Sequence, residues 1–169
     1  MYVGISEYSP EKTLEFAAAL RPWNVPLLIH QPSYNIFQRK IENGLFEAVE
    51  RVGAGMIAFW TLAQGVLSGR YLGGIPTDSR AARGTRFLLP SNITPELLDK
   101  VRALNEIARA RGQTLAQLAI AWVLRDPRMS SALVGASSVE QLSENVAAVR
   151  HLGFAAEELA AIDRIAGTA

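Results

Sequence analysis

The sequence predicts an α/β fold made of parallel βα units, and three observations carry this prediction. Four short apolar runs, YVGIS, PLLIHQ, GMIAF and SALVGAS, each end in small or polar residues and lead into a helical segment. The first three runs begin near positions 2, 27 and 56, which is about one βα unit apart. A complete (β/α)8 TIM barrel needs about 250 residues, whereas this chain has 169. We therefore expect half of such a barrel, with four parallel strands corresponding to strands 5–8 and an additional C-terminal helix.

Apolar periodicity and capping signals place the individual elements. We expect strands at 2–6, 27–30, 56–59 and 131–134. Helices are expected at 9–20, 44–52, 94–111, 114–124, 138–149 and 157–165, and a short helix or ordered loop at 62–71. Thr94 is a suitable N-cap, and Thr114 with Gln117 has the spacing of a capping box. The segment of about 73–92 is expected to be a long irregular loop within one domain, 1–169.

Composition excludes several classes of function. The chain has 17 basic and 16 acidic residues, a net charge of +1 and no cysteine. Such a balance provides no field to attract nucleic acid, and the lack of thiols removes disulfides and thiolate ligands. Two histidines and scattered acids predict no metal site. No apolar run approaches the ~20 residues of a membrane span and the N-terminus does not resemble a signal peptide, so we expect no membrane insertion and a cytoplasmic location.

The ends of the predicted strands are where a ligand is expected, because ligands gather at the carboxyl ends of parallel strands. This rule selects Ser6, Gln31, residues 59–61 and residues 135–138. His30 precedes Gln31, so the two side chains point to opposite faces of the strand. An aromatic side chain at 59 or 60 suits stacking on a flat ring, and packing in the core is the alternative, which must hold for one of the two residues.

Two segments have the small residues that a phosphate group needs. Residues 135–138 join the fourth strand to a helix start, where main-chain N–H groups and the helix dipole attract anions. Ser138 with Gln141 also forms a capping box, which needs no ligand. Residues 64–70 combine small residues with Arg70, which is able to meet a diphosphate, and an ordinary surface loop is the alternative there.

Taken together, these segments resemble the aldo-keto reductases, which are NADP-dependent (β/α)8-barrel enzymes. Within that family they resemble the branch that contains L-glyceraldehyde 3-phosphate reductase and the beta subunits of voltage-gated potassium channels. The resemblance covers essentially the whole chain, in order. The motifs that carry it are YVGIS at 2–6, QPSYN at 31–35, LAQG at 62–65, SGRY at 68–71, Ile75-Pro76, Ser79-Arg80, GAS at 135–137, Gln141-Leu142 and Glu144-Asn145.

The resemblance implies a role for each matching position in holding NADP(H). Ser6 and Gln31 would hold the nicotinamide carboxamide, and Phe59 would stack on the nicotinamide ring. Other residues would contact the diphosphate (Leu62, Ala63, Gln64 and Arg70), close over the cofactor (Arg80) and hold the adenosine end (Gly135, Ser137, Gln141, Glu144 and Asn145). NAD(H) is the alternative cofactor, because Ser138 stands where many relatives have a basic residue.

The sequence also departs from the family pattern. Trp60 and Thr61 stand where the family usually has Ser or Thr followed by Pro. The catalytic Asp, Tyr, Lys and His of the family come from the first half of the barrel, and no residue of this chain matches them. The resemblance therefore implies the cofactor-binding half of an aldehyde or ketone reductase, inactive alone, whose small carbonyl substrate binds only in a complete barrel. Its partner would be the missing N-terminal half-barrel or a second copy of itself. The alternatives are a non-catalytic, self-associating scaffold and a regulatory protein that resembles the channel beta subunits.

Overall fold

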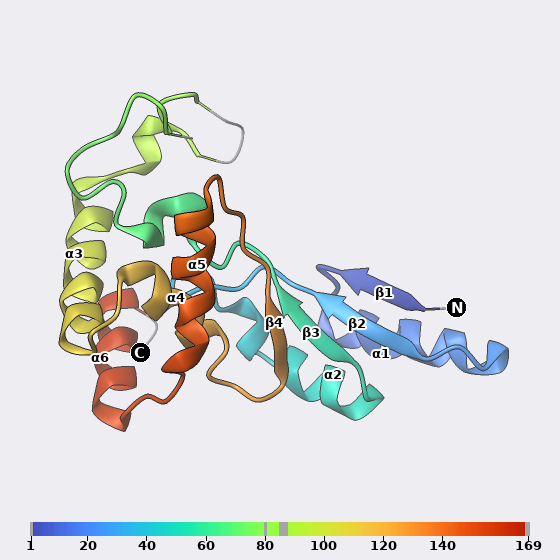
Figure 1. Cartoon of the computed structure of the whole chain (residues 1–169). Helices are drawn as coiled ribbons and strands as arrows, with labels where there is room; N and C mark the ends of the chain where they lie inside the picture. Colours follow the sequence, from blue (N-terminus) through green and yellow to red (C-terminus); the bar gives the residue numbers. More distant parts are fainter. Residues whose placement is uncertain (1, 80, 85–87, 168–169) are drawn as a thin grey trace. The chain divides into compact units, whose positions relative to one another are not determined.

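The computed structural model describes residues 2–79, 81–84 and 88–167. Its strands are β1 (Val3–Ser6), β2 (Leu27–Gln31), β3 (Gly55–Ala58) and β4 (Met129–Ala132), as labelled in Figure 1. Its α-helices are α1 (Pro10–Leu20), α2 (Leu45–Val52), α3 (Pro95–Ala110), α4 (Leu115–Val123), α5 (Val139–Ala147) and α6 (Ala156–Ala166). Short 3-10 helices occur at η1 (Arg21–Trp23), η2 (Lys40–Glu42), η3 (Ala63–Ser68), η4 (Pro90–Asn92) and η5 (Ala148–Arg150).

The four strands form one parallel sheet in the order β1-β2-β3-β4. Ser6 lies opposite Gln31 and His30 lies opposite Met56, and the register shifts once between Val3 and Gly4 and once between Met56 and Ile57. Because each strand follows its neighbour in sequence and helical segments connect them, the architecture is four successive βα units. This arrangement confirms the expected half of a TIM barrel.

The fourth strand differs most from its expected position, since it runs from Met129 rather than from residue 131. The Asp126 side chain accepts a hydrogen bond from the Arg128 main-chain N–H at 2.9 Å, which closes a turn and starts the strand at once. The apolar Leu133, taken as part of the strand, is 55% exposed. Its N–H still donates to the Ala58 carbonyl at 2.7 Å, so pairing with β3 continues just beyond the strand.

Helix boundaries follow the capping residues closely. Thr94 accepts a hydrogen bond from the Leu97 N–H at 3.2 Å and is the N-cap of α3. Thr114 and Gln117 exchange reciprocal hydrogen bonds of 3.0 and 3.2 Å, which is the expected capping box. Residues 62–71, expected as a short helix or ordered loop, contain the segment η3, whose backbone is non-helical at Gln64, Gly65 and Leu67.

The contacts of the chain cluster into two compact units. Unit 1 contains the described residues up to Thr61 together with Val123–Val134, and therefore the whole sheet with α1 and α2. Unit 2 contains Leu62–Trp122 and the described residues from Gly135 onward. In unit 1, α1 packs on α2 and α2 contacts β3.

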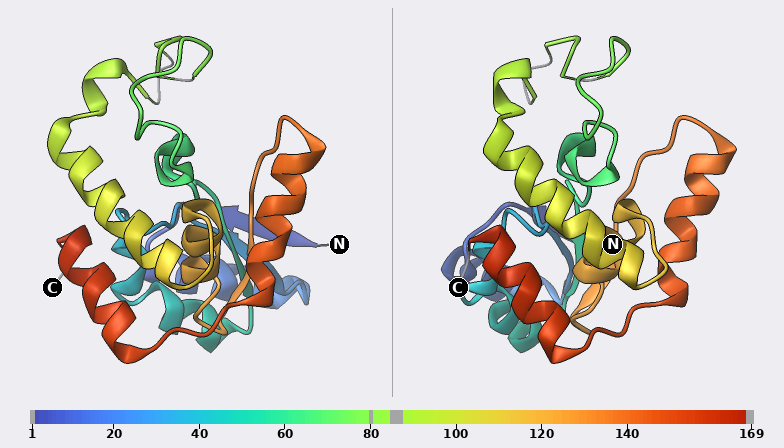
Figure 2. Two further views of the ribbon diagram at one scale, coloured as in Figure 1. Left: turned by 60° about the vertical axis from the view of Figure 1, so that its left-hand side comes forward. Right: turned by 90° about the vertical axis from the view of Figure 1, so that its left-hand side faces the viewer.

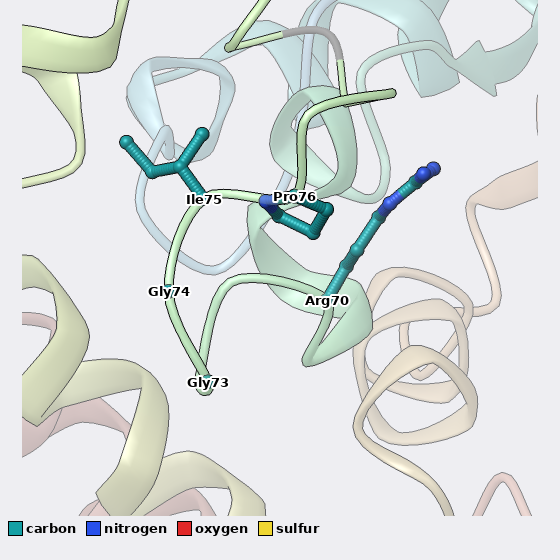
Figure 3. Close-up of a pocket in the computed structure, with 5 residues that line it drawn as sticks. All are labelled: Arg70, Gly73, Gly74, Ile75 and Pro76. Carbon is teal, nitrogen blue, oxygen red and sulfur yellow. The ribbon is translucent and has the colours of Figure 1, made fainter.

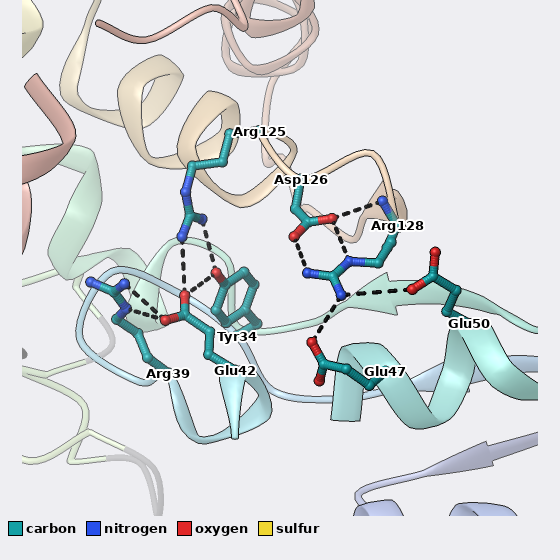
Figure 4. Close-up of polar contacts among 8 residues, drawn as sticks. All are labelled: Tyr34, Arg39, Glu42, Glu47, Glu50, Arg125, Asp126 and Arg128. Atoms are coloured by element: carbon teal, nitrogen blue, oxygen red, sulfur yellow. Dashed lines mark hydrogen bonds and ion pairs between the residues drawn. The ribbon is translucent and has the colours of Figure 1, made fainter. Parts of the chain in front are cut away.

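A half-buried ionic network links the segment after β2 to the residues that precede β4 (Figure 4). The Tyr34 hydroxyl donates to Glu42 at 2.5 Å, and Arg125 donates to both Tyr34 and Glu42, at 2.8 and 3.0 Å. Arg39 pairs with the other Glu42 oxygen at 2.8 Å. Burial works to raise the pKa of Glu42, but the hydrogen bonds from Arg39, Tyr34 and Arg125 outweigh it and the pKa is lowered. The carboxylate therefore stays charged and ties these segments of unit 1 together.

In unit 2, helices α3 and α6 lie side by side (Figure 2). The Lys100 ammonium donates to the Ala166 carbonyl at 2.9 Å, near the C-terminal end of α6, where a cation is favourable. Most of α4 is buried, including Leu118 and Trp122 at 0% exposure. Its apolar character on all sides fits a central helix. Among the described residues, no helix combines the length and apolar character that crossing a membrane requires.

Candidate functional site

Two of the expected nicotinamide residues lie together at the carboxyl edge of the sheet in unit 1. Ser6 ends β1 and Gln31 ends β2, directly opposite one another in register. The Ser6 hydroxyl donates to the Gln31 carbonyl at 2.7 Å. This bond uses the Gln31 main chain and not its side-chain carboxamide, and Gln31 is half-buried.

Glu7 was missed by sequence reasoning and organises this edge. It has a φ of 60°, in the left-handed region that is uncommon for a residue with a side chain. Its carboxylate accepts hydrogen bonds from the Ser33 main-chain N–H and from the Lys40 ammonium, each at 2.5 Å. Partial burial works to raise the pKa of Glu7, but the hydrogen bonds from Lys40 and Ser33 prevail and lower it. The polar position directly after an apolar run was the only sequence signal for it.

Phe59, the expected stacking residue, belongs to an aromatic pair. The Phe59 and Trp60 rings have centroids 5.9 Å apart, are tilted by 57°, and are both half-buried. Trp60 has a left-handed φ of 62°. Thr61 turns inward and is 1% exposed, with its hydroxyl donating to the Leu133 carbonyl at 3.2 Å. The residue that replaces the usual proline is thus an anchor between β3 and the segment after β4.

His30 lies apart from this set, as the alternation of the strand requires. It is 0% exposed, and burial lowers its pKa below the ordinary value. Among the described residues, neither ring nitrogen has a hydrogen bond of good geometry, and the interactions with the Tyr8 main chain and the Glu7 charge, which work to raise the pKa, are outweighed by burial. His30 is therefore a neutral residue of the core.

The residues expected at the diphosphate form a tight turn in unit 2. Ala63 and Gln64 have left-handed φ values of 46° and 59°, and Gly65 follows at 95°. The Leu62 carbonyl accepts hydrogen bonds from the N–H groups of Gly65 and Leu67, at 2.8 and 3.1 Å. Consecutive left-handed residues of this kind are costly, and they cluster at ligand sites.

Arg70 lines a cavity of about 300 Å³ together with Gly73, Gly74, Ile75 and Pro76 (Figure 3). Its guanidinium pairs with the Asp78 carboxylate at 2.5 Å. That hydrogen bond holds the pKa of Asp78 below its ordinary value. A phosphate group approaching Arg70 would therefore compete with Asp78. Arg80, expected to close over the cofactor, lies outside the described residues.

The residues expected at the adenosine end surround the start of α5, also in unit 2. Ser138 accepts from the Gln141 N–H at 3.2 Å and is the N-cap. The Gln141 side-chain oxygen accepts from the Ser137 N–H at 2.7 Å, so the second half of the expected capping box is made one residue earlier. Gly135 has open space around it, with nothing within 4 Å of where a Cβ would be.

Glu144 and Asn145 lie further along the same helix. The Glu144 carbonyl accepts from the Gln117 side chain at 3.1 Å, which packs α5 on α4. Asn145 is 4% exposed, and its side-chain N–H₂ has no hydrogen-bond partner among the described residues. A buried donor of this kind is expensive to leave unpaired, which fits a group that is completed by a ligand.

The described residues of the expected site fall into three sets along the chain, and the part of the chain that the structure describes holds no group of side chains that could bind a metal. The nicotinamide set is in unit 1, and the diphosphate and adenosine sets are in unit 2.

Comparison with known proteins gives a consistent result. Residues 1–166 match the model of the aldo/keto reductase family. The chain is 51% identical over 168 residues to an L-glyceraldehyde 3-phosphate reductase of Escherichia coli strain K12, and equally to one of Escherichia coli O157:H7. Each match covers 97% of this chain but 49% of the relative, so the chain spans about half the length of the curated relatives it matches. The chain belongs to the aldo/keto reductase family.

Proposed function

We propose that this chain is the NADP(H)-binding half of an aldo-keto reductase. Ser6, Gln31 and Phe59 would receive the nicotinamide end. The diphosphate and adenosine ends would be received by the unit 2 residues described above. NAD(H) is the alternative cofactor, because Ser138 is an N-cap serine with no positive charge for a 2′-phosphate.

The observation that carries the proposal is the meeting of Ser6, Gln31 and Phe59 at one edge of one sheet. Ser6 and Gln31 are paired in register, and Phe59 is bridged to Ser33, two residues beyond Gln31. A nicotinamide group has a carboxamide that needs hydrogen-bond donors and acceptors, and a flat ring that stacks on an aromatic side chain. Ser6 and Gln31 would supply the first, and Phe59 the second. The buried side-chain N–H₂ of Asn145, which has no hydrogen-bond partner among the described residues, independently supports the proposal that this end of the chain binds the adenosine of the cofactor.

A bound NADPH supplies hydride to a carbonyl carbon, and the complete barrel would perform this reduction on a small aldehyde or ketone. The family resemblance implies that the proton-donating Tyr and its Asp, Lys and His neighbours belong to the first half of the barrel. We therefore propose that the 169-residue chain is inactive alone. Aldehyde-dependent oxidation of NADPH by the purified chain would contradict this part of the proposal.

A fluorescence titration tests cofactor binding directly. NADPH should quench the fluorescence of Trp60 saturably, and Trp60→Phe identifies the contribution of this residue. 2′,5′-ADP, which has the adenosine end alone, should also bind but should quench less. If neither compound gives a saturable change, the proposed function is wrong.

The partner is proposed from the sheet itself. β1 and β4 are the edges of the order β1-β2-β3-β4, and open edges favour pairing with further strands. We propose that the N-terminal half-barrel, or a second copy of this chain, pairs there. Light scattering measures whether the chain forms a homodimer. A tight homodimer without affinity for NADPH would favour the alternative of a non-catalytic, self-associating scaffold.

A further inference from the structure

Asn35 lies just beyond β2 and has no role in the function proposed above. It is 2% exposed, within unit 1. Its side-chain oxygen accepts hydrogen bonds from the main-chain N–H groups of Phe37 and Gln38, at 2.9 and 3.1 Å. Only an oxygen can accept both, so the amide orientation is settled by its surroundings.

The other end of the same amide reaches across to the segment after β3. The Asn35 side-chain N–H₂ donates to the Trp60 carbonyl at 3.1 Å. Trp60 has a φ of 62°, and this left-handed conformation is costly for a residue with a bulky side chain. A buried hydrogen bond to the carbonyl of that residue supports the unusual backbone where it would otherwise relax.

The main chain on either side of this bond is also held. The Tyr34 N–H donates to the Phe59 carbonyl at 3.1 Å, and the Phe59 N–H donates to the Pro32 carbonyl at 3.0 Å. On the far side, the Thr61 hydroxyl bonds to the Leu133 carbonyl at 3.2 Å. The Phe59 and Trp60 rings are only half-buried. The Asn35 side chain, which follows β2, therefore helps to hold the main chain that carries them.

We propose that Asn35 is a positioning residue that fixes the Phe59–Trp60 aromatic pair in the orientation that meets the nicotinamide ring. The proposal rests on the proposed function for the identity of the ligand, but not for the geometry of the pair. Asn35 touches no ligand itself and acts through the main chain of Trp60.

Asn35→Asp separates the two tasks of this side chain. One carboxylate oxygen still accepts from Phe37 and Gln38, which preserves the local turn. The other oxygen replaces the donor and faces the Trp60 carbonyl, so an attraction becomes a repulsion. Gln38→Met is the matched control, because it removes the 3.0 Å side-chain bond from Gln38 to Ser33 in the same turn and keeps the Gln38 main-chain N–H that donates to Asn35.

The first measurement needs no cofactor. In the 169-residue chain labelled with 5-fluorotryptophan, the fluorine resonance of Trp60 is assigned with Trp60→Phe. Asn35→Asp should shift this resonance and leave those of Trp23 and Trp122 in place, whereas Gln38→Met should shift none. An unmoved Trp60 resonance in Asn35→Asp overturns the proposal. Asn35→Ser, which lacks the N–H₂ group that donates to the Trp60 carbonyl, replaces Asn35→Asp if the latter does not fold.

The second measurement compares two ligands. Asn35→Asp should bind NADPH about tenfold more weakly, equivalent to about 1.4 kcal/mol, and 2′,5′-ADP with unchanged affinity. A general structural defect would weaken both ligands together, and that result, like unchanged NADPH binding, overturns the positioning role. If the wild-type chain binds no NADPH, the proposed function fails, and the fluorine spectrum still decides whether Asn35 positions the pair.

Discussion

At the carboxyl edge of the sheet, single polar residues connect the segments that follow the strands by hydrogen bonds. Glu7 bridges the end of β1 to Ser33 and Lys40 with two hydrogen bonds of 2.5 Å. Thr61 and Asn35 perform similar bridging toward the Leu133 and Trp60 carbonyls. Each is a polar side chain that satisfies main-chain groups where regular pairing stops, which is what buried backbone requires. The shape of this edge therefore depends on a few charges and amides.

Glu7→Gln should make stability less sensitive to acid. The pKa of Glu7 in the folded protein lies below its ordinary value of 4.5, so its contribution is complete above 4.5 and is lost as the pH falls through the lowered folded value. The difference in unfolding free energy between wild type and Glu7→Gln, measured with urea, should be largest at neutral pH and shrink below pH 4.5. Glu15→Gln removes the same charge from an exposed pair with Lys12 and is the control. A difference independent of pH would contradict the role of Glu7.

His30→Leu should stabilise the protein, most strongly in weak acid. Burial lowers the pKa of His30 below its ordinary value of 6.5, so the unfolded chain takes up a proton first and stability falls as the pH drops below 6.5. Removing the ring nitrogens, which have no hydrogen bond of good geometry among the described residues, should raise the unfolding free energy by about 1 kcal/mol at neutral pH, and by more at pH 5.5. His151→Leu, at an exposed position, controls for the loss of a histidine. A lower stability in His30→Leu at every pH would show that the imidazole is paired.

At the scale of elements, the sequence predicts helices more closely than it predicts the ends of strands. Thr94 and Thr114 mark helix starts by short-range hydrogen bonds that depend only on neighbouring residues. The start of β4 depends instead on the Asp126–Arg128 turn and on the partner strand β3. Glu7 and Asn35 were missed for the same reason, since their partners lie about 25 residues away in sequence. Pairing across strands is not readable from local pattern.

The fit between β3 and β4 predicts the outcome of a glycine substitution. A Cβ on Gly55 would lie 2.7 Å from the Ser130 hydroxyl oxygen. Gly55→Ala should therefore reduce the unfolding free energy by about 1–3 kcal/mol, as overpacking does. Adding Ser130→Ala removes the clashing oxygen and should recover part of the loss, although it also removes the 3.3 Å bond to the Met56 N–H. Gly153→Ala, with nothing within 4 Å, is the control. Gly55→Ala as stable as wild type would contradict this packing.

At the scale of the whole molecule, the fold class and the family were predictable because they rest on the order of many segments. Four parallel strands in sequence order and a family match over residues 1–166 agree with that reading. The chain spans about half the length of the relatives it matches. Its two compact units carry different sets of the expected cofactor residues. We propose that this chain binds NADPH.

The most direct test of that claim is calorimetric titration of NADPH into the chain and into two variants. The wild type should show saturable binding with one NADPH per chain. Gln31→Ala should weaken NADPH but not 2′,5′-ADP, and Asn145→Ala should weaken both, each by about tenfold, or about 1.4 kcal/mol. No saturable heat from NADPH with the wild type, or equal affinity in all three proteins, would contradict the account.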